Sequence, residues 1–183
     1  PEPDRNAEAV LFVTGGAIWL TIDGAAQEMT AGGYAYIPPG TAWQVRNEAS
    51  APAVFHWIRK HYVAVEGIAI PPSFVTSDAE LPPTPMPDCE GAWATTRFVD
   101  PDDLRHAMHV NIVTFQPGGR IPFAETHVME HALFVLQGHG RYLLNTDWVE
   151  VGAGDMMWLR AFCPQACIAG GDEPFRYLLY KDV

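Results

Sequence analysis

The stretch EHALFVLQGHGRYLLNTDWVEVGAGD (residues 130–155) resembles a stretch near the start of the chain, EAVLFVTGGAIWLTIDGAAQEMTAGG (residues 8–33). The two align without a gap at an offset of 122 residues, so that Leu-Phe-Val falls on Leu-Phe-Val and Gly16 falls on Gly138. The match continues to the end of the chain, where Arg59 falls on Lys181. Similarity at one fixed offset is the mark of a repeated structural unit. The sequence therefore predicts a duplicated unit rather than one irregular domain.

Each repeat has the pattern of β-strands. Short apolar or alternating runs are separated by Gly and Pro, and no segment of helical length keeps an apolar period of 3.6 residues. This pattern favours an all-β sandwich or barrel over α/β folds, whose parallel strands need helices between them. Strands are predicted at residues 9–15, 17–23, 34–40, 54–60, 109–115, 132–138, 141–145, 155–159 and 175–181.

A Pro-rich segment, residues 71–91, separates the two repeats. Because Pro cannot donate a hydrogen bond to a sheet, this segment is predicted to be a linker between an N-terminal unit (residues 1–70) and a C-terminal unit (residues 92–183). Residues 98–129 of the second unit have almost no counterpart before Glu8. We therefore expect the first unit to be incomplete at its N-terminus.

Composition and charge exclude several kinds of partner. A net charge of −11 and a pI near 4.9 argue against nucleic acid and against anionic membrane surfaces. No apolar run approaches the ~20 residues that a membrane helix needs. Three cysteines do not suggest a disulfide framework, so we expect a cytoplasmic protein, although an N-terminal address could have been lost because the chain lacks an initiator Met. Exposed sheet edges lead us to expect a homo-oligomer.

The stretch ETHVMEH (residues 125–131) contains the strongest candidate for a metal site. On a strand, the even spacing of Glu125, His127 and His131 would place these side chains on one face, together with apolar neighbours. A carboxylate and two imidazoles in apolar surroundings are costly unless they bind a cation. The alternative is that they are exposed polar residues at the entrance of a strand. The first repeat has Ala9 where the second has His131, so we expect the chemistry in the second unit.

The spacing of these residues resembles the first cupin motif. The segment from Gly119 to Gly138 has a Gly, five residues, two ligands flanking one residue, a third ligand and a closing Gly, with the usual His, His, Glu order permuted. In the first repeat, Trp43 replaces the metal-binding His of the second cupin motif. The resemblance implies two tandem cupin jelly-roll β-barrels, of which the first holds no metal.

Three segments narrow the resemblance to the (S)-ureidoglycine aminohydrolases: ETHVMEH, CPQAC (residues 163–167) and the terminal FRYLLYKDV (residues 175–183). This family releases ammonia from ureidoglycine and yields ureidoglycolate in purine and allantoin catabolism. The resemblance implies a small-molecule ureide substrate, with Lys181 and Glu125 in catalytic roles. It also implies a manganese ion held by Glu125, His127, His131 and Gln165, and a substrate pocket that includes Tyr142, Tyr177 and Lys181.

The chemistry of the donors agrees with this resemblance. Carboxylate and amide oxygens with two imidazoles, and no thiolate, suit Mn²⁺ or Fe²⁺ better than a structural zinc, and another divalent metal remains an option. Two alternatives stay open. The chain could be another Mn or Fe bicupin enzyme, such as a dioxygenase or a decarboxylase, or a ligand-binding cupin without catalytic activity.

Overall fold

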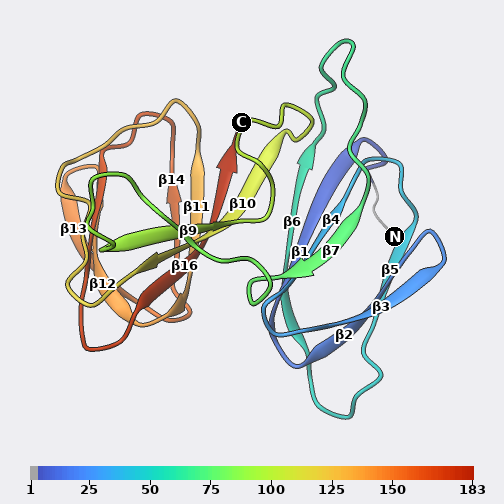
Figure 1. The fold of residues 1–183 in the computed structure, drawn as a ribbon, viewed down its shortest axis with the longest axis horizontal. Coiled ribbons are helices and arrows are strands. Elements are labelled where there is room, and N and C mark those ends of the chain that lie inside the picture. Colours follow the sequence, from blue (N-terminus) through green and yellow to red (C-terminus); the bar gives the residue numbers. More distant parts are fainter. Residues whose placement is uncertain (1–3) are drawn as a thin grey trace. The chain divides into compact units, whose positions relative to one another are not determined.

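The computed structural model describes residues 4–183, and this part of the chain contains β-strands and no α-helix (Figure 1). The prediction of an all-β fold is confirmed. Two compact units are present: one contains the residues up to Leu81 together with Asp102–Ala107, and the other contains Pro82–Pro101 and Met108–Val183. The described residues include no helix long and apolar enough to cross a membrane.

The first unit contains two antiparallel sheets. One sheet has the strand order β6-β1-β4-β7 and the other has the order β3-β2-β5. Their facing side chains form an apolar core that includes Leu11, Val13, Ile18 and Leu20. The strands are β1 (Ala7–Gly15), β2 (Ala17–Ile22), β3 (Ala25–Thr30), β4 (Gly33–Ile37), β5 (Trp43–Arg46), β6 (Val54–His61) and β7 (Phe74–Ser77).

The second unit has the same construction with a larger sheet. Its two antiparallel sheets have the orders β14-β11-β16-β10-β9-β8 and β13-β12-β15. Phe115, Leu133, Val135 and Phe175 lie in the core. The strands are β8 (Thr84–Pro85), β9 (Trp93–Arg97), β10 (Met108–Phe115), β11 (His131–Gln137), β12 (His139–Leu144), β13 (Asp147–Gly152), β14 (Met156–Leu159), β15 (Gln165–Ala169) and β16 (Phe175–Asp182).

The predicted duplication is confirmed strand by strand. The orders β6-β1-β4 and β3-β2-β5 recur as β16-β11-β14 and β13-β12-β15. Gly16 and Gly138 have φ of 69° and 73°, and a Cβ on either glycine would lie 2.6 Å from a carbonyl oxygen, that of Pro52 or Pro174 respectively. Both the positive φ and the close backbone approach require glycine. The glycine and its contact are therefore repeated at the same offset as the strands.

The segment predicted as a linker, residues 71–91, is not free of strands. Strand β7 pairs with β4 in the first unit, and β8 pairs with β9 in the second. The prolines lie mainly at positions 71, 72, 82 and 83, on either side of β7, so that residues 74–77 keep their backbone donors. Division between the units falls at Leu81, inside the predicted linker.

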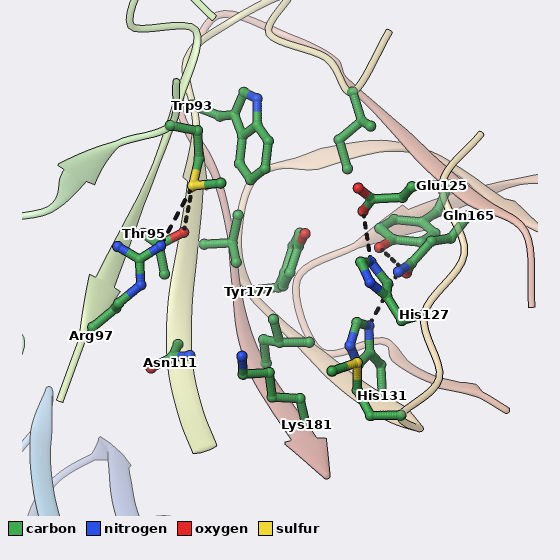
Figure 2. A pocket seen from close by; sticks show the side chains of 16 residues that line it. Trp93, Thr95, Arg97, Asn111, Glu125, His127, His131, Gln165, Tyr177 and Lys181 are labelled. Carbon is green, nitrogen blue, oxygen red and sulfur yellow. Dashed lines mark hydrogen bonds and ion pairs between the residues drawn. The ribbon is translucent and has the colours of Figure 1, made fainter. Parts of the chain in front are cut away.

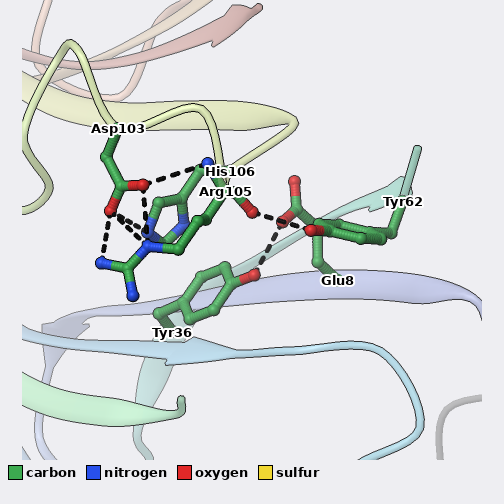
Figure 3. A network of polar contacts seen from close by, with 6 residues as sticks. All are labelled: Glu8, Tyr36, Tyr62, Asp103, Arg105 and His106. Carbon is green, nitrogen blue, oxygen red and sulfur yellow. Dashed lines mark hydrogen bonds and ion pairs between the residues drawn. The ribbon is translucent and has the colours of Figure 1, made fainter. Parts of the chain in front are cut away.

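Residues 102–107 return to the first unit and are held there by polar contacts (Figure 3). The Tyr62 hydroxyl donates to the Arg105 carbonyl at 3.0 Å, and the Lys60 ammonium donates to the Ala107 carbonyl at 2.7 Å. The His106 ring lies edge-on to Tyr36, with 4.5 Å between the ring centroids. Tyr36 donates in turn to the buried carboxylate of Glu8 at 2.9 Å.

Strands β8, β9 and β10 have no counterpart in the described part of the first unit. They extend the larger sheet of the second unit beyond β16. In the first unit, β6 is equivalent to β16 and forms the edge of the sheet β6-β1-β4-β7 among residues 4–183. This agrees with the lack of a match for residues 98–129 before Glu8. Strands β9 and β10 provide one wall of a cavity in the second unit.

Candidate functional site

A cavity of about 210 Å³ lies inside the second unit, and all seven predicted site residues line it (Figure 2). It is smaller than the roughly 300–1,000 Å³ of pockets for drug-sized ligands, which favours a small molecule. The predicted residues among its lining are Glu125, His127, His131, Tyr142, Gln165, Tyr177 and Lys181.

Backbone pairing places Glu125 and Gln165, two of the candidate metal ligands, beside each other. Glu125 and Gln165 form an isolated antiparallel bridge in which each backbone N–H donates to the other's carbonyl at 2.9 Å. His131 is the first residue of β11. Residues 121–130 form no regular strand, so the argument from strand alternation was wrong. Bonding of this segment to β15, followed by a bend at residues 128–129, brings the three side chains together instead.

Contacts among the four candidate ligands occur in two pairs. Glu125 Oε1 lies 3.3 Å from His127 Nε2, and Gln165 Nε2 lies 3.2 Å from His131 Nδ1. The two imidazole rings are 4.8 Å apart between centroids. His131 and Gln165 are buried, whereas the side chains of Glu125 and His127 keep 25% and 34% of their exposure. The cavity is therefore open to solvent on the side of Glu125 and His127.

Burial controls the protonation of His131. It lowers the pKa of this imidazole to about 4, helped by the nearby His127 and Lys181 and opposed by the hydrogen bond with Gln165. A neutral imidazole keeps a lone pair for a cation, since metal binding requires deprotonated ligands. Near neutral pH, His131 is therefore in the form that a metal needs.

The four donors fit a divalent cation in chemical type, because they combine one carboxylate, one amide and two imidazoles around a shared cavity. Among residues 4–183, however, no group of three His, Cys, Asp or Glu side chains is already arranged for an ion. The Glu125–His127 pair and the His131–Gln165 pair would have to turn toward each other for all four to reach one ion. The site is thus chemically suited to a metal but not fully preassembled.

The two tyrosines form a polar layer behind the donors. Tyr142 donates from its hydroxyl to Gln165 Oε1 at 3.0 Å, and its ring lies 6.1 Å from the ring of Tyr177. Burial raises the pKa of both hydroxyls, so both stay protonated near neutral pH. Burial, and then the neighbouring Arg97, lowers the pKa of Lys181. The cavity therefore combines neutral hydroxyl donors with an amine that loses its proton more easily than an exposed lysine.

The equivalent positions of the first unit carry no such set. Ala9 is buried in its core in place of His131, and Trp43 packs against that core in place of Gln165. Trp43 also contacts Trp57, with ring centroids 5.5 Å apart. An apolar core thus occupies the volume that corresponds to the polar site of the second unit.

Sequence reasoning missed the opposite wall of the cavity. Trp93, Thr95 and Arg97 reach it from β9, and Asn111 reaches it from β10. The missed signal is the alternation in WATTR (residues 93–97), which was not identified as a strand. These strands have no counterpart in the first repeat, so the overlay of the two repeats offered no contrast that could mark their polar residues.

Comparisons with known proteins identify the family. The cupin domain model matches residues 1–59 and 111–180. The chain is 32% identical over 180 residues to (S)-ureidoglycine aminohydrolase of Escherichia coli and 32% identical over 182 residues to that of Arabidopsis thaliana. The two alignments include 97% and 99% of this chain, which spans 67% and 59% of the lengths of these two relatives, respectively.

A solved structure is more similar still. The crystal structure from Pseudomonas aeruginosa described as "Putative Glyoxylate Induced Protein" has 63% sequence identity and a TM-score of 0.95, and the match covers 100% of this chain and 68% of that one. The chain belongs to the cupin superfamily and, within it, to the family of the (S)-ureidoglycine aminohydrolases.

Proposed function

We propose that the protein is a metal-dependent (S)-ureidoglycine aminohydrolase that uses Mn²⁺. The observation that carries the proposal is the convergence of all seven predicted residues on one small cavity of the second unit. Curated relatives of that name support the choice of substrate. The reaction breaks the bond between the central carbon and its amino group, forms a bond from that carbon to a water oxygen, and releases one ammonia per water consumed.

Glu125, His127, His131 and Gln165 would hold the metal, whose chemical contribution is a cationic centre that lowers the pKa of water and attracts the carboxylate of the substrate. One carboxylate against a divalent charge leaves about one positive charge, because Gln and neutral His add none. The lowered pKa of His131 supports its place in the set, since this imidazole stays neutral over the physiological range.

Lys181 is the candidate for moving protons. Its side chain lines the cavity, and its lowered pKa allows both the ammonium and the amine to exist closer to neutral pH than is usual for lysine. The ammonium gives its proton to the departing amino group, and the resulting amine takes a proton from the attacking water. Lys181 thus returns to its starting form after each turnover.

Tyr142 and Tyr177 bind and orient. Tyr142 holds the Gln165 amide through the 3.0 Å hydrogen bond, which fixes one candidate ligand, and Tyr177 presents a protonated hydroxyl to the cavity. The apolar side chains of Val113, Ile121 and Leu179 also line the cavity and limit the water around the reacting carbon.

The test is ammonia release from ureidoglycine, generated in place from allantoate because the substrate is labile. Metal-stripped protein is assayed with and without added Mn²⁺, beside the Glu125→Ala variant. We expect manganese-dependent release that favours one enantiomer and is lost in the variant. No release above the spontaneous rate, from protein shown to be folded and metal-loaded, would refute the proposal. Oxygen consumption with related substrates would then point to a cupin dioxygenase.

A further inference from the structure

Arg97 and Asn111 form a polar wall across the cavity from the candidate metal ligands. They are directly opposed residues on the antiparallel strands β9 and β10, and both side chains line the cavity. In the close view, Arg97, Thr95 and Asn111 lie on one side, the four donors lie on the other, and Tyr177 and Lys181 lie between them (Figure 2). A ligand that reaches the donors would therefore also meet this wall.

Asn111 has a hydrogen-bond acceptor with no protein partner. Its residue is 5% exposed, and its Oδ1 is fully buried without a hydrogen-bond partner among the described residues. A buried acceptor that stays unpaired is costly, and such atoms are rare in folded proteins. Because this oxygen has almost no exposed surface, the side-chain amide must turn toward the cavity before an N–H group of a bound ligand can satisfy it.

Arg97 has donor capacity to spare. Its Nη2 approaches the thioether sulfur of Met86 at 3.7 Å, and Thr95 Oγ1 approaches the same sulfur at 3.8 Å. A thioether is a weak acceptor, whereas a guanidinium has five N–H donors. A carbonyl oxygen of a ligand would be a much stronger partner for the guanidinium. The wall therefore offers donors from Arg97 next to an acceptor from Asn111.

We propose that Arg97 and Asn111 recognise the ureido group of the substrate, an inference that rests on the proposed ureide chemistry of the site. The ureido carbonyl accepts from the Arg97 guanidinium, and the terminal ureido NH₂ donates to Asn111 Oδ1. A carboxylate could accept from the Arg97 guanidinium but has no N–H for the Asn111 acceptor, whereas the ureido group can pair with both residues. The ureido end therefore points to β9 and β10, and the carboxylate and the reacting carbon point to Lys181 and the four donors.

Equilibrium binding of two inert ligands tests the inference without turnover. Hydantoate carries a ureido group and a carboxylate, and N-acetylglycine replaces the terminal NH₂ by a methyl group of similar size. Calorimetry on the manganese-loaded protein should show hydantoate binding about tenfold more tightly, since one buried hydrogen bond distinguishes the two ligands. We expect Asn111→Leu to remove this preference and Arg97→Met to weaken both ligands by similar factors. The control Arg120→Met, an exposed arginine outside the cavity lining, should change neither.

A preference for hydantoate that persists in Asn111→Leu would overturn the inference. So would unchanged binding of N-ethylurea, which has no carboxylate, in an Arg97→Met variant that binds hydantoate poorly, because Arg97 would then hold the carboxylate. Asn111→Ser serves as a second variant, and circular dichroism establishes that each variant is folded. Failure of the proposed function looks different: wild-type protein would release no ammonia yet keep the ligand preference.

Discussion

His131 and Lys181 are directly opposed on the antiparallel strands β11 and β16. A candidate metal ligand and the candidate proton carrier thus form one cross-strand pair. In such pairs the two Cβ atoms are about 4.5–5.5 Å apart. The same register places His109 opposite Lys181 on the other side, on β10. Lys181 is therefore held by the middle of a sheet, where its position depends on strand pairing rather than on a flexible loop.

Replacement of Lys181 should affect catalysis more than binding. Lys181→Met removes the proton carrier, so kcat should fall by about 100-fold or more while the folded structure persists. Burial lowers the pKa of Lys181, so in the wild-type protein kcat should fall as pH increases through that lowered value, because the ammonium that protonates the departing amino group is lost. This limb of the pH profile should vanish in Lys181→Met. Lys181→Arg is the matched variant, because arginine keeps the charge but cannot deprotonate. A pH limb retained in either variant would assign it to another group.

Glu125 should control metal affinity. Glu125→Gln removes the carboxylate charge from the donor set with almost no change of volume, and we expect Mn²⁺ affinity to fall by at least about 100-fold. Calorimetric titration of metal-stripped protein with Mn²⁺ measures this change. Glu130→Gln is the control, because Glu130 is close in sequence but absent from the cavity lining. Equal losses in both variants would mean that overall charge, not coordination, governs the affinity.

Tyr142 should act through Gln165. Tyr142→Phe leaves Gln165 Oε1 without its 3.0 Å hydrogen bond in a buried position. We expect about 1–2 kcal/mol of lost stability and a roughly tenfold weaker affinity for Mn²⁺, because the amide is no longer held in place. Thermal unfolding and metal titration measure the two effects. Loss of stability with unchanged metal affinity would restrict Tyr142 to packing.

The fold was predictable because the duplication supplied a second copy of each strand to compare. Gly16 and Gly138 illustrate this: each has a positive φ and a close approach to a backbone carbonyl, a requirement that chance would not place at the same offset. Strands β3, β5, β13 and β15 were not predicted although the overlay covers them, because their short runs contain few large apolar residues, as in AAQEMT of β3 and QACIA of β15. Strands β7, β8 and β9 lie outside the aligned repeats, and the high Pro content around them concealed their short runs.

The site was predicted in composition but not in its backbone. Glu125, His127 and His131 do converge, although Glu125 is placed by its bridge to Gln165 and not by strand alternation. Gln165 differs from the equivalent Trp43 of the first repeat, but its role as a metal ligand could be identified only through the family, because a lone Gln on an apolar strand does not indicate a metal site. Arg97 and Asn111 are 14 residues apart in sequence and meet through the pairing of β9 with β10, a long-range contact that local patterns do not reveal.

Segment 102–107 contains an acid-sensitive ion pair between two of its own residues, Asp103 and Arg105. Hydrogen bonds from the Arg105 guanidinium and backbone lower the pKa of Asp103 to about 2, from a usual value of 3.8. Because the pKa is lower in the folded state, the stabilisation is complete above pH 3.8 and is lost as the pH falls toward 2. The Arg105 side chain is 45% exposed, so solvent screening reduces the contribution to about 1 kcal/mol.

Asp103→Asn should therefore lower the free energy of unfolding by about 1 kcal/mol at pH 7, and the difference from wild type should shrink toward zero between pH 4 and pH 2. Urea unfolding at a series of pH values measures this convergence. Asp172→Asn is the control, since Asp172 is exposed and lies in a turn of the second unit, and it should leave the curve unchanged. A constant difference at all pH values would show that the effect of the substitution does not come from the Asp103 charge.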